Sequence, residues 1–327
     1  MAKEIKNIGV LTSGGDAPGM NAAIRAVVRS CVYYNLKCTG IYRGYDGLIE
    51  GDFKPYEVRS VSKILGRGGT VLKSARSKGF MTAEGRKKAH ENLVNAGVDA
   101  LITIGGNGTF TGAHIFQEEF GIPVMGIPGT IDNDLYGSDN TIGFDTACNT
   151  VVEAVDKIRD TANSHNRLFF VEVMGRDAGF IALRAGIATG AIAIMLPEKE
   201  MSIDELVHIL DEGAKSAKTS SIVIVAEGDA NGGAYEVAKK VNEKYSHFET
   251  KVTVLGHIQR GGSPSHWDRV LASRMGVGAV EGLLNGKSDV MIGVVNDRET
   301  YTPLLEAISR KATPNAEEIR ISRILSI

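Results

Sequence analysis

Short runs of apolar residues alternate with helix-period patterns along most of this chain. The apolar runs span residues 7–13, 99–106, 123–130, 168–175, 191–198, 220–228 and 251–259, and helical patterns cover 18–34 and 108–120. Runs that are apolar throughout predict strands buried on both faces, as in a parallel sheet covered by helices. The pattern therefore predicts an α/β fold with mainly parallel sheets. Such sheets bind ligands at the carboxyl ends of their strands, so functional residues are expected directly after each run.

Length and composition limit the function classes. A chain of 327 residues has room for two α/β lobes, with a candidate boundary near residue 140, after GTIDNDLYGSDNT. The net charge of −2 argues against a nucleic-acid partner. The longest apolar segment, residues 185–196, is shorter than the ~20 residues that span a bilayer, so no membrane partner is expected. Cys31, Cys38 and Cys148 form no disulfide or metal-binding pattern, which predicts a cytoplasmic location.

Two glycine-rich loops each follow an apolar run and precede a helical pattern. They are TSGGDAPGMN (12–21) and GGNGT (105–109). Glycines at such a turn let backbone N–H groups approach an anion, and a helix N-terminus favours negative charge. The first loop alone is equally consistent with a tight turn in which Asp16 caps the helix. Two such loops on one sheet edge favour a polyphosphate or two phosphorylated ligands.

The segment from residue 128 to residue 147 contains four aspartates: Asp132, Asp134, Asp139 and Asp145. Carboxylates beside phosphate loops indicate Mg²⁺ ligation and a general base. A polar loop with Asx turns is the simpler alternative. The Asp-Asn-Asp spacing between two hydrophobic runs favours the functional interpretation.

Basic residues stand at other strand ends or loop turns: Arg76, Arg167, Arg176, His257 and Arg260. Guanidinium groups make planar contacts with phosphate oxygens. Each arginine alone is as consistent with an ordinary surface charge, but several at strand ends indicate an anion site. Glu227 ends another run, where it is placed to accept hydrogen bonds from sugar hydroxyls or to form a cap or salt bridge.

Together these segments resemble the bacterial-type ATP-dependent 6-phosphofructokinases (the phosphofructokinase A family). The matching stretches are IGVLTSGGDAPGMNAAIR, GTIDND, IRDTANSHNR, VEVMGRDAG and VLGHIQRGGSP, the last followed by DRVLASRMG. The resemblance implies transfer of the ATP γ-phosphoryl group to the 1-hydroxyl of fructose 6-phosphate in glycolysis, with Mg²⁺. It also implies two similar three-layer α/β/α lobes with the active site in the cleft between them. Residues 1–139 and 257–303 form the nucleotide-binding lobe, and residues 140–256 and 304–327 form the sugar-phosphate-binding lobe.

The resemblance also implies residue roles. Asp132 matches the general base, Thr130 and Arg176 match contacts to the transferring phosphoryl group, and Asp134 matches a magnesium ligand. The nucleotide positions are Gly15, Tyr45, Arg76, Ser77, Asn107, Gly108, Thr109 and Gly112. The sugar-phosphate positions are Thr130, Asp132, Arg167, Met174, Gly175, Arg176, Glu227, Lys251, His257 and Arg260.

Two further expectations concern the donor and the assembly. Pyrophosphate-using relatives usually carry Asp where Gly108 stands and Lys where Gly129 stands, so the two glycines predict that ATP is preferred. Arg167 matches an arginine that a neighbouring subunit supplies to the sugar phosphate, which implies a homotetramer.

The chain departs from the family pattern at two active-site positions. Asn107 replaces an Asp that helps to hold Mg-ATP, so a weakened metal contact is expected there. Lys251 replaces a partner-subunit Arg, which keeps the charge but loses the bidentate fork. These departures leave two alternatives beside the active kinase: a catalytically impaired paralogue that binds ligand or regulates a partner, and a kinase with another donor or sugar.

The effector site of the family is only partly retained. Its cationic positions are matched by Arg25, Arg29, Arg159 and Lys218. Val58, Ile192 and Ser216 replace an Arg, a metal-binding Glu and a Lys, although Arg59 adjoins the first of these. We therefore expect weak or altered allostery.

Overall fold

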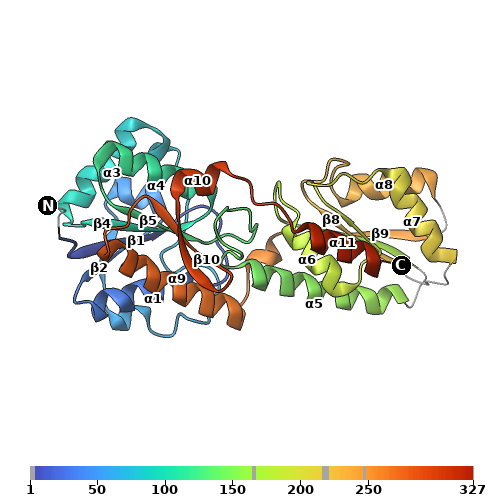
Figure 1. Cartoon of the computed structure of the whole chain (residues 1–327), viewed down its shortest axis with the longest axis horizontal. Helices are drawn as coiled ribbons and strands as arrows, with labels where there is room; N and C mark the ends of the chain where they lie inside the picture. Colours follow the sequence, from blue (N-terminus) through green and yellow to red (C-terminus); the bar gives the residue numbers. More distant parts are fainter. Residues whose placement is uncertain (1–3, 164–166, 216–220, 246–247, 327) are drawn as a thin grey trace. The chain divides into compact units, whose positions relative to one another are not determined.

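The computed structural model describes residues 4–163, 167–215, 221–245 and 248–326, which form two compact units (Figure 1). The first unit contains the described residues up to Thr130 together with Leu135–Thr146 and Arg260–Lys311. The second contains Ile131–Asp134, Ala147–Gln259 and the described residues from Ala312 onward. These are groups of residues in mutual contact. The lobe boundaries after residues 139, 256 and 303 concern folding domains and stay a prediction.

The first unit is built on a mixed sheet of seven described strands. Their order is β11 (Arg298–Pro303), β10 (Val290–Val295), β5 (Val124–Pro128), β4 (Ala100–Gly105), β1 (Asn7–Thr12), β2 (Lys37–Ile41) and β3 (Phe53–Tyr56). The five inner strands pair in parallel, and the edge strands β3 and β11 pair antiparallel. Every residue of β1, β4 and β5 is buried, as expected for strands covered on both faces.

Helices cover both faces of this sheet (Figure 1). On one face α1 (Met20–Tyr33) packs against α9 (His266–Leu284). On the other lie α2 (Gly44–Glu50), α3 (Ala83–Asn95), α4 (Asn107–Phe120) and α10 (Leu304–Ser309). Two short 3-10 helices lie in the connections: η1 (Val58–Val61) contacts α1, and η2 (Gly79–Met81) contacts α2 and α3. Phe110 and Phe116 of α4 fill the core against the sheet. This unit is therefore a three-layer α/β/α sandwich.

The second unit has a smaller, parallel sheet. Its described strands run in the order β7 (Ala193–Met195), β8 (Ser221–Ala226), β6 (Arg167–Val173) and β9 (Glu249–Val254). Helices α7 (Ile203–Lys215) and α8 (Ala234–Lys244) form a core with Phe170, while α6 (Phe180–Thr189) packs on β7 and β8 and against α11 (Ala316–Leu325). Helix α5 (Phe144–Asn163) begins in the first unit and continues in the second. The expected α/β class with mostly parallel sheets is confirmed.

Two strands are shorter than the sequence predicts. The run at 251–259 ends as a strand at Val254, and Gly256–Arg260 forms the 3-10 helix η3, because Gly256 has a φ of 53° that an extended strand does not accommodate. The run at 191–198 contributes only Ala193–Met195. There the chain turns around Pro197, so that the N–H of Lys199 donates to the carbonyl of Leu196 at 3.2 Å.

Strand register brings the functional loops to common edges. In the first unit Thr12 pairs with Ile104, and Gly105 pairs with Pro128, so β1, β4 and β5 end side by side. In the second unit Val173 pairs with Ala226, so β6 and β8 also end together. Within each unit, the expectation that the loops after successive apolar runs converge is met.

None of the described helices is long and apolar enough to cross a membrane.

We expect Phe170→Ala to lower the free energy of unfolding by about 3–5 kcal/mol, because the ring is wholly buried against α7 and α8. Urea unfolding followed by far-UV circular dichroism measures this. Tyr235→Ala, at a residue that is 66% exposed, is the control and should change stability by less than about 0.5 kcal/mol. Equal effects of the two substitutions would contradict the assignment of Phe170 to the core.

Candidate active site

The loop between β1 and α1 lies against a guanidinium group of the same unit. Nη1 of Arg260 donates to the carbonyl oxygen of Asp16 at 3.2 Å, and a Cβ on Gly15 would lie 2.7 Å from the same nitrogen. A larger residue at position 15 would require the guanidinium group to shift away from this loop. Helix α1 begins after Gly19 with no side-chain hydrogen bond from the described residues to its N-terminus, so the alternative in which Asp16 caps it is wrong.

The second glycine-rich loop is tied directly to the first. The hydroxyl of Thr109 donates to the carbonyl of Ser13 at 3.0 Å, and a Cβ on Gly105 would lie 2.5 Å from that carbonyl oxygen. Gly108, in the first turn of α4, is exposed, and no atom of the described residues lies within 4 Å of a Cβ built there. Because a helix N-terminus attracts anions, this open turn suits a phosphate group.

Tyr45, a predicted nucleotide position, lies in the core beneath α4. Its ring stacks on Phe80 with a centroid distance of 4.0 Å, and its hydroxyl donates to the carbonyl of Thr109. A Cβ on Gly112 would lie 3.0 Å from the ring, so glycine is needed for this approach. Burial raises the pKa of the Tyr45 hydroxyl well above its usual range. In this structure Tyr45 supports the first turn of α4, and a direct nucleotide contact stays a prediction.

The segment before η2 lies beside the first loop. The hydroxyl of Ser74 donates to the carbonyl of Gly14 at 2.6 Å, and Arg76, two residues later, is exposed. The hydroxyl of Ser77 accepts a hydrogen bond from the N–H of Phe80 at 3.2 Å. This segment thus brings both predicted nucleotide residues, Arg76 and Ser77, to the part of the chain that adjoins the glycine loops.

Thr130 lies beside the second glycine loop. The N–H of Gly129 donates to the carbonyl of Gly105 at 3.0 Å, and a Cβ on Gly106 would lie 3.6 Å from the Cβ of Thr130. Asp132 follows two residues later along the chain and is half-buried. The predicted phosphoryl contact therefore stands next to the predicted phosphate loop, with the predicted base close in sequence.

The four aspartates of this segment divide into two pairs. Asp139 accepts a hydrogen bond from the N–H of Asn296 at 2.8 Å, and Asp145 accepts one from the hydroxyl of Ser265 at 2.5 Å. Both bonds hold loops of the first unit in place. Asp132 and Asp134 belong to the short segment that groups with the second unit. The role of Asp132 as the general base and that of Asp134 as a metal ligand stay predictions.

In the second unit, Glu227 holds the loop that carries Arg176. Oε1 of Glu227 accepts from the N–H groups of Arg176 at 2.7 Å and of Gly175 at 3.3 Å. Arg176 has a φ of 58°, in the left-handed region, which costs a non-glycine residue about 1–2 kcal/mol. A Cβ on Gly228 would clash with the carbonyl oxygen of Arg176. Glu227 therefore fixes the backbone from which the Arg176 guanidinium extends.

Gln259, which the sequence analysis missed, joins the neighbouring loops. Its Oε1 accepts from the N–H of Met174 at 3.2 Å, and its Nε2 donates to the carbonyl of Gly256 at 3.0 Å. Gln259 is wholly buried. The exposed His257 lies between Gly256 and Gln259 on η3. The structure thus brings together five predicted sugar-phosphate positions: Met174, Gly175, Arg176, Glu227 and His257. A polar residue inside a glycine-rich motif was the available signal for Gln259.

Arg167 and Lys251 share one carboxylate. Nε of Arg167 lies 2.8 Å from Glu249, and Nζ of Lys251 lies 2.6 Å from its other oxygen. Parallel register places Arg167 beside Glu249 at the start of β6 and β9. The hydrogen bonds from Lys251 and then Arg167 lower the pKa of the Glu249 carboxyl to about 2. The two predicted phosphate-binding cations are therefore close together, and Glu249 competes for both.

The predicted effector cations lie in different units. Arg25 and Arg29 are one turn apart on α1, and burial followed by the charge of Arg29 lowers the pKa of Arg25. Arg159, on α5, donates to the carbonyl of Thr189. Lys218 and Ser216 lie outside the described residues. Ile192 is buried, and Val58 is exposed on η1. The degraded effector site stays a prediction.

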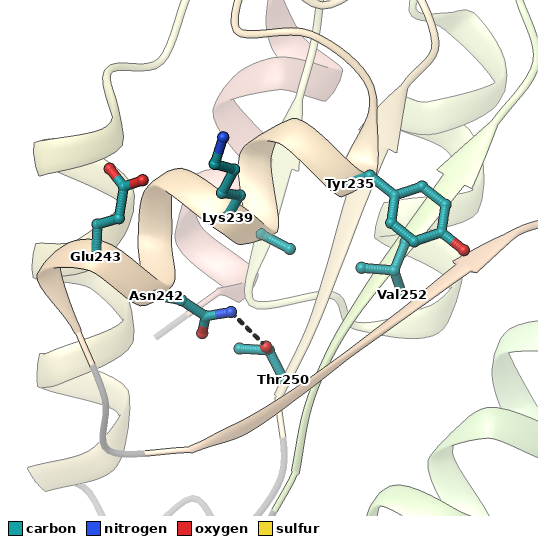
Figure 2. A pocket seen from close by; sticks show the side chains of 7 residues that line it. Tyr235, Lys239, Asn242, Glu243, Thr250 and Val252 are labelled. Atoms are coloured by element: carbon teal, nitrogen blue, oxygen red, sulfur yellow. Dashed lines mark hydrogen bonds between the residues drawn. The ribbon is translucent and has the colours of Figure 1, made fainter.

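A groove of about 420 Å³ lies between α8 and β9, and none of its lining residues is a predicted site residue (Figure 2). Lys239 and Glu243 line it from the helix, and Nδ2 of Asn242 donates to the hydroxyl of Thr250 at 2.8 Å across its floor. Side chains alternate along a strand, so Thr250 and Val252 face the groove while Lys251 faces away. None of the predicted site residues lines this groove, and it is not the candidate active site.

Sequence comparisons find one family profile and curated relatives that match most of the chain. The phosphofructokinase family profile matches residues 7–283. A curated relative from Bacteroides thetaiotaomicron, named ATP-dependent 6-phosphofructokinase 2, is 52% identical over 323 residues, which cover 99% of each chain. The protein named ATP-dependent 6-phosphofructokinase 1 from Thermus thermophilus is 54% identical over 323 residues, covering 99% of this chain and 100% of its own.

Solved structures share the fold. Phosphofructokinase from Saccharomyces cerevisiae superposes with a TM-score of 0.89 at 38% identity over 93% of this chain, which spans only 45% of the yeast chain. A pyrophosphate-dependent phosphofructokinase from Marinobacter aquaeolei superposes with a TM-score of 0.84 at 22% identity, covering 99% of this chain and 92% of its own. The second similarity concerns the fold alone.

We expect Gly108→Ala to weaken ATP binding by about tenfold, or ~1.4 kcal/mol, because the methyl group would occupy the open side of the phosphate loop. Stability should stay equal or rise, since Ala is the better helix former. Isothermal titration calorimetry and thermal unfolding measure the two effects. Glu118→Ala, near the far end of the same helix, is the control and should leave ATP binding unchanged. Unaltered affinity in Gly108→Ala would remove Gly108 from the nucleotide site.

Proposed function

This chain belongs to the phosphofructokinase family, and on that basis we propose that it is an ATP-dependent 6-phosphofructokinase. It transfers the γ-phosphoryl group of ATP to the 1-hydroxyl of fructose 6-phosphate and so acts in glycolysis. Relatives that carry this name match the chain over nearly its full length. They give no support to the alternative of a catalytically impaired paralogue, and Asp132, Asp134 and Arg176 are all present.

The observation that carries the proposal is the meeting of three loops at one sheet edge. The Thr109–Ser13 hydrogen bond joins the two glycine loops, and Thr130 lies against Gly106. ATP rather than pyrophosphate is the proposed donor, because Gly108 leaves open space where a larger side chain would stand. A Cβ on Gly129 would already lie 3.0 Å from Ile104, so a lysine there would need the core to shift.

The chemistry proposed for the chain's own residues is positioning and charge stabilisation, which phosphoryl transfer mainly requires. Asp132 accepts the proton of the 1-hydroxyl as general base. Thr130 and Arg176 stabilise the charge on the transferring phosphoryl group. The Glu227 hydrogen bonds hold the Arg176 backbone in one conformation, so little reorganisation is needed when substrate binds.

Magnesium is the proposed cofactor, held by Asp134 and more weakly by Asn107. The described residues contain no group of three His, Cys, Asp or Glu side chains able to hold a metal by themselves. This donor set suits Mg²⁺, which usually binds through one or two carboxylates together with substrate phosphates. When bound, the ion neutralises charge on the ATP phosphates. Asn107 offers a neutral carbonyl oxygen in place of a carboxylate, so this chain holds the ion less tightly from α4.

The sugar-phosphate site is proposed to be shared between subunits of a homotetramer. Arg167 and Lys251 supply cations to a neighbouring subunit, while Met174, Gly175, His257 and Arg260 act with the catalytic residues. Allosteric control by phosphoenolpyruvate or ADP is proposed to be weak, because Val58, Ile192 and Ser216 replace charged positions. A cytoplasmic location is proposed because the three cysteines are free thiols and the substrates are glycolytic.

A coupled assay of fructose 1,6-bisphosphate formation tests the function, with ATP or pyrophosphate as donor. We expect turnover with ATP and Mg²⁺ that is lost on chelation by EDTA. If the protein binds ATP but forms no fructose 1,6-bisphosphate with either donor, the proposal is wrong. The alternative of a catalytically impaired paralogue would then be favoured.

We expect Asn107→Asp to raise kcat/KM for ATP by at least about tenfold, because a carboxylate attracts Mg²⁺ more strongly than an amide does. Asn95→Asp, exposed on α3, adds the same charge elsewhere and should have no effect. Peptide mass spectrometry must show intact Asn107 in the wild type, since an Asn-Gly pair is prone to deamidation. Equal rates in wild type and Asn107→Asp would show that the amide is tolerated.

We expect Glu249→Gln to lower the KM for fructose 6-phosphate by up to about fivefold, because it frees Arg167 and Lys251 from two ion pairs with a surface carboxylate, which are weak. The value of kcat should not change. Glu243→Gln, on α8, removes a carboxylate elsewhere in the unit and serves as the control. A higher KM in Glu249→Gln would mean that the carboxylate orients the cations instead of competing for them.

A further inference from the structure

The carbonyl group of Thr130 accepts a hydrogen bond from another threonine. The hydroxyl of Thr141 donates to this oxygen at 2.5 Å, and both residues are buried. The two threonines are 11 positions apart along the chain, and Asp132, Asp134 and Asp139 lie between them. The hydrogen bond therefore closes the base of the loop that carries the proposed general base.

The residue after Thr141 is itself fixed to the end of β5. The N–H of Ile142 donates to the carbonyl of Pro128 at 2.9 Å, and Gly129 and Ile142 form an isolated parallel bridge. The two ends of the loop thus lie side by side, and the bond from the Thr141 hydroxyl to Thr130 is a second link between them.

A buried carboxylate anchors the residues that follow Thr141. Asp268, in the first turn of α9, accepts from the N–H of Gly143 at 2.8 Å, from the N–H of Thr146 at 2.9 Å and from the hydroxyl of Thr146 at 2.5 Å. Asp268 has no exposed surface, and burial is the main reason that its pKa is raised. The described hydrogen bonds use both of its oxygens, so the start of α5 is held in one position relative to α9.

We propose that Thr141 and Asp268 are positioning residues for phosphoryl transfer, which set the place of Thr130 and of the segment leading to Asp132. Asp268 holds Gly143 and Thr146, and Thr141, two positions before Gly143 along the chain, holds Thr130. A displacement of a reacting group by about 1 Å costs on the order of a hundredfold in rate, so a bond that fixes this peptide acts directly on catalysis. The inference rests on the proposed phosphofructokinase activity.

Two substitutions at Thr141 separate positioning from packing. Thr141→Val keeps the shape and loses the hydroxyl, and Thr141→Ser keeps the hydroxyl and loses a methyl group. We expect kcat to fall by about tenfold in Thr141→Val, with KM for ATP within about twofold of wild type, and to stay near wild type in Thr141→Ser. Thermal unfolding should show a lower Tm in Thr141→Ser. A purely structural role gives the opposite order in kcat, with Thr141→Ser the more damaged.

Asp268→Asn tests the role of the buried carboxylate. The Asn amide keeps one acceptor oxygen, but its NH₂ group would face the N–H of Gly143 or the N–H and hydroxyl of Thr146, which are donors too. We therefore expect kcat to fall at least as far as in Thr141→Val. The Thr141 pair still decides the question if this variant does not fold. Calorimetric titration with ATP and with fructose 6-phosphate distinguishes a failure of the proposed function from a failure of the positioning role. A wild type that binds but does not turn over refutes the proposed function, whereas an active wild type with equal kcat in all Thr141 variants refutes only the positioning role.

Discussion

The parallel pairing of β4 with β1 and with β5 is the constraint on which the site of the first unit depends. Because Thr12 is level with Ile104, and Gly105 with Pro128, three connections leave the sheet at neighbouring points on one edge. One residue of slip would turn every side chain of a strand to the opposite face. Since both faces of these strands are buried, such a slip would also bury different side chains in both cores. The register that packs the core therefore also sets the spacing of the phosphate loops and Thr130.

Buried polar contacts then fix loops that the strands alone would leave free to vary. Thr109 bonds to Ser13, and Asp268 bonds to the turn before α5. A donor or acceptor left unsatisfied in these buried places would cost about 1–3 kcal/mol, so each bond strongly favours one loop conformation. At the surface, Glu227 bonds to the backbone of Arg176. Glycines at 105 and 228 leave room for the backbone to approach closely at the first and the last of these bonds. Catalysis by positioning needs this kind of rigidity more than it needs unusual acidity in any one group.

The two expected departures from the family pattern, Asn107 and Lys251, leave the fold unchanged. Gly106 and Gly108 flank Asn107, and β9 pairs with β6 in regular register through Lys251. We therefore propose that they alter the strength of two electrostatic contacts on an unchanged scaffold. Glu249 adds to this at Lys251, because a neighbouring carboxylate reduces the attraction of both cations for an anion.

The sequence by itself determined the features that depend on local patterns. Continuous apolar runs predicted the buried strands, and glycines after β1 and β4 predicted two loops on one sheet edge, for which we propose phosphate binding. Burial on both faces and close backbone approach restrict residue type at adjacent positions, which is why these features can be seen in the sequence. Only the tertiary structure decided which side chains serve the site indirectly. Tyr45 proved to be packed beneath α4, and Asp16 proved not to cap α1. Glu249 and Gln259 proved to be partners of predicted site residues, and Asp268 proved to be a partner of the turn before α5. The physical reason is separation along the chain: Thr146 and Asp268 are 122 residues apart, and no local pattern specifies which distant donor a buried carboxylate will meet.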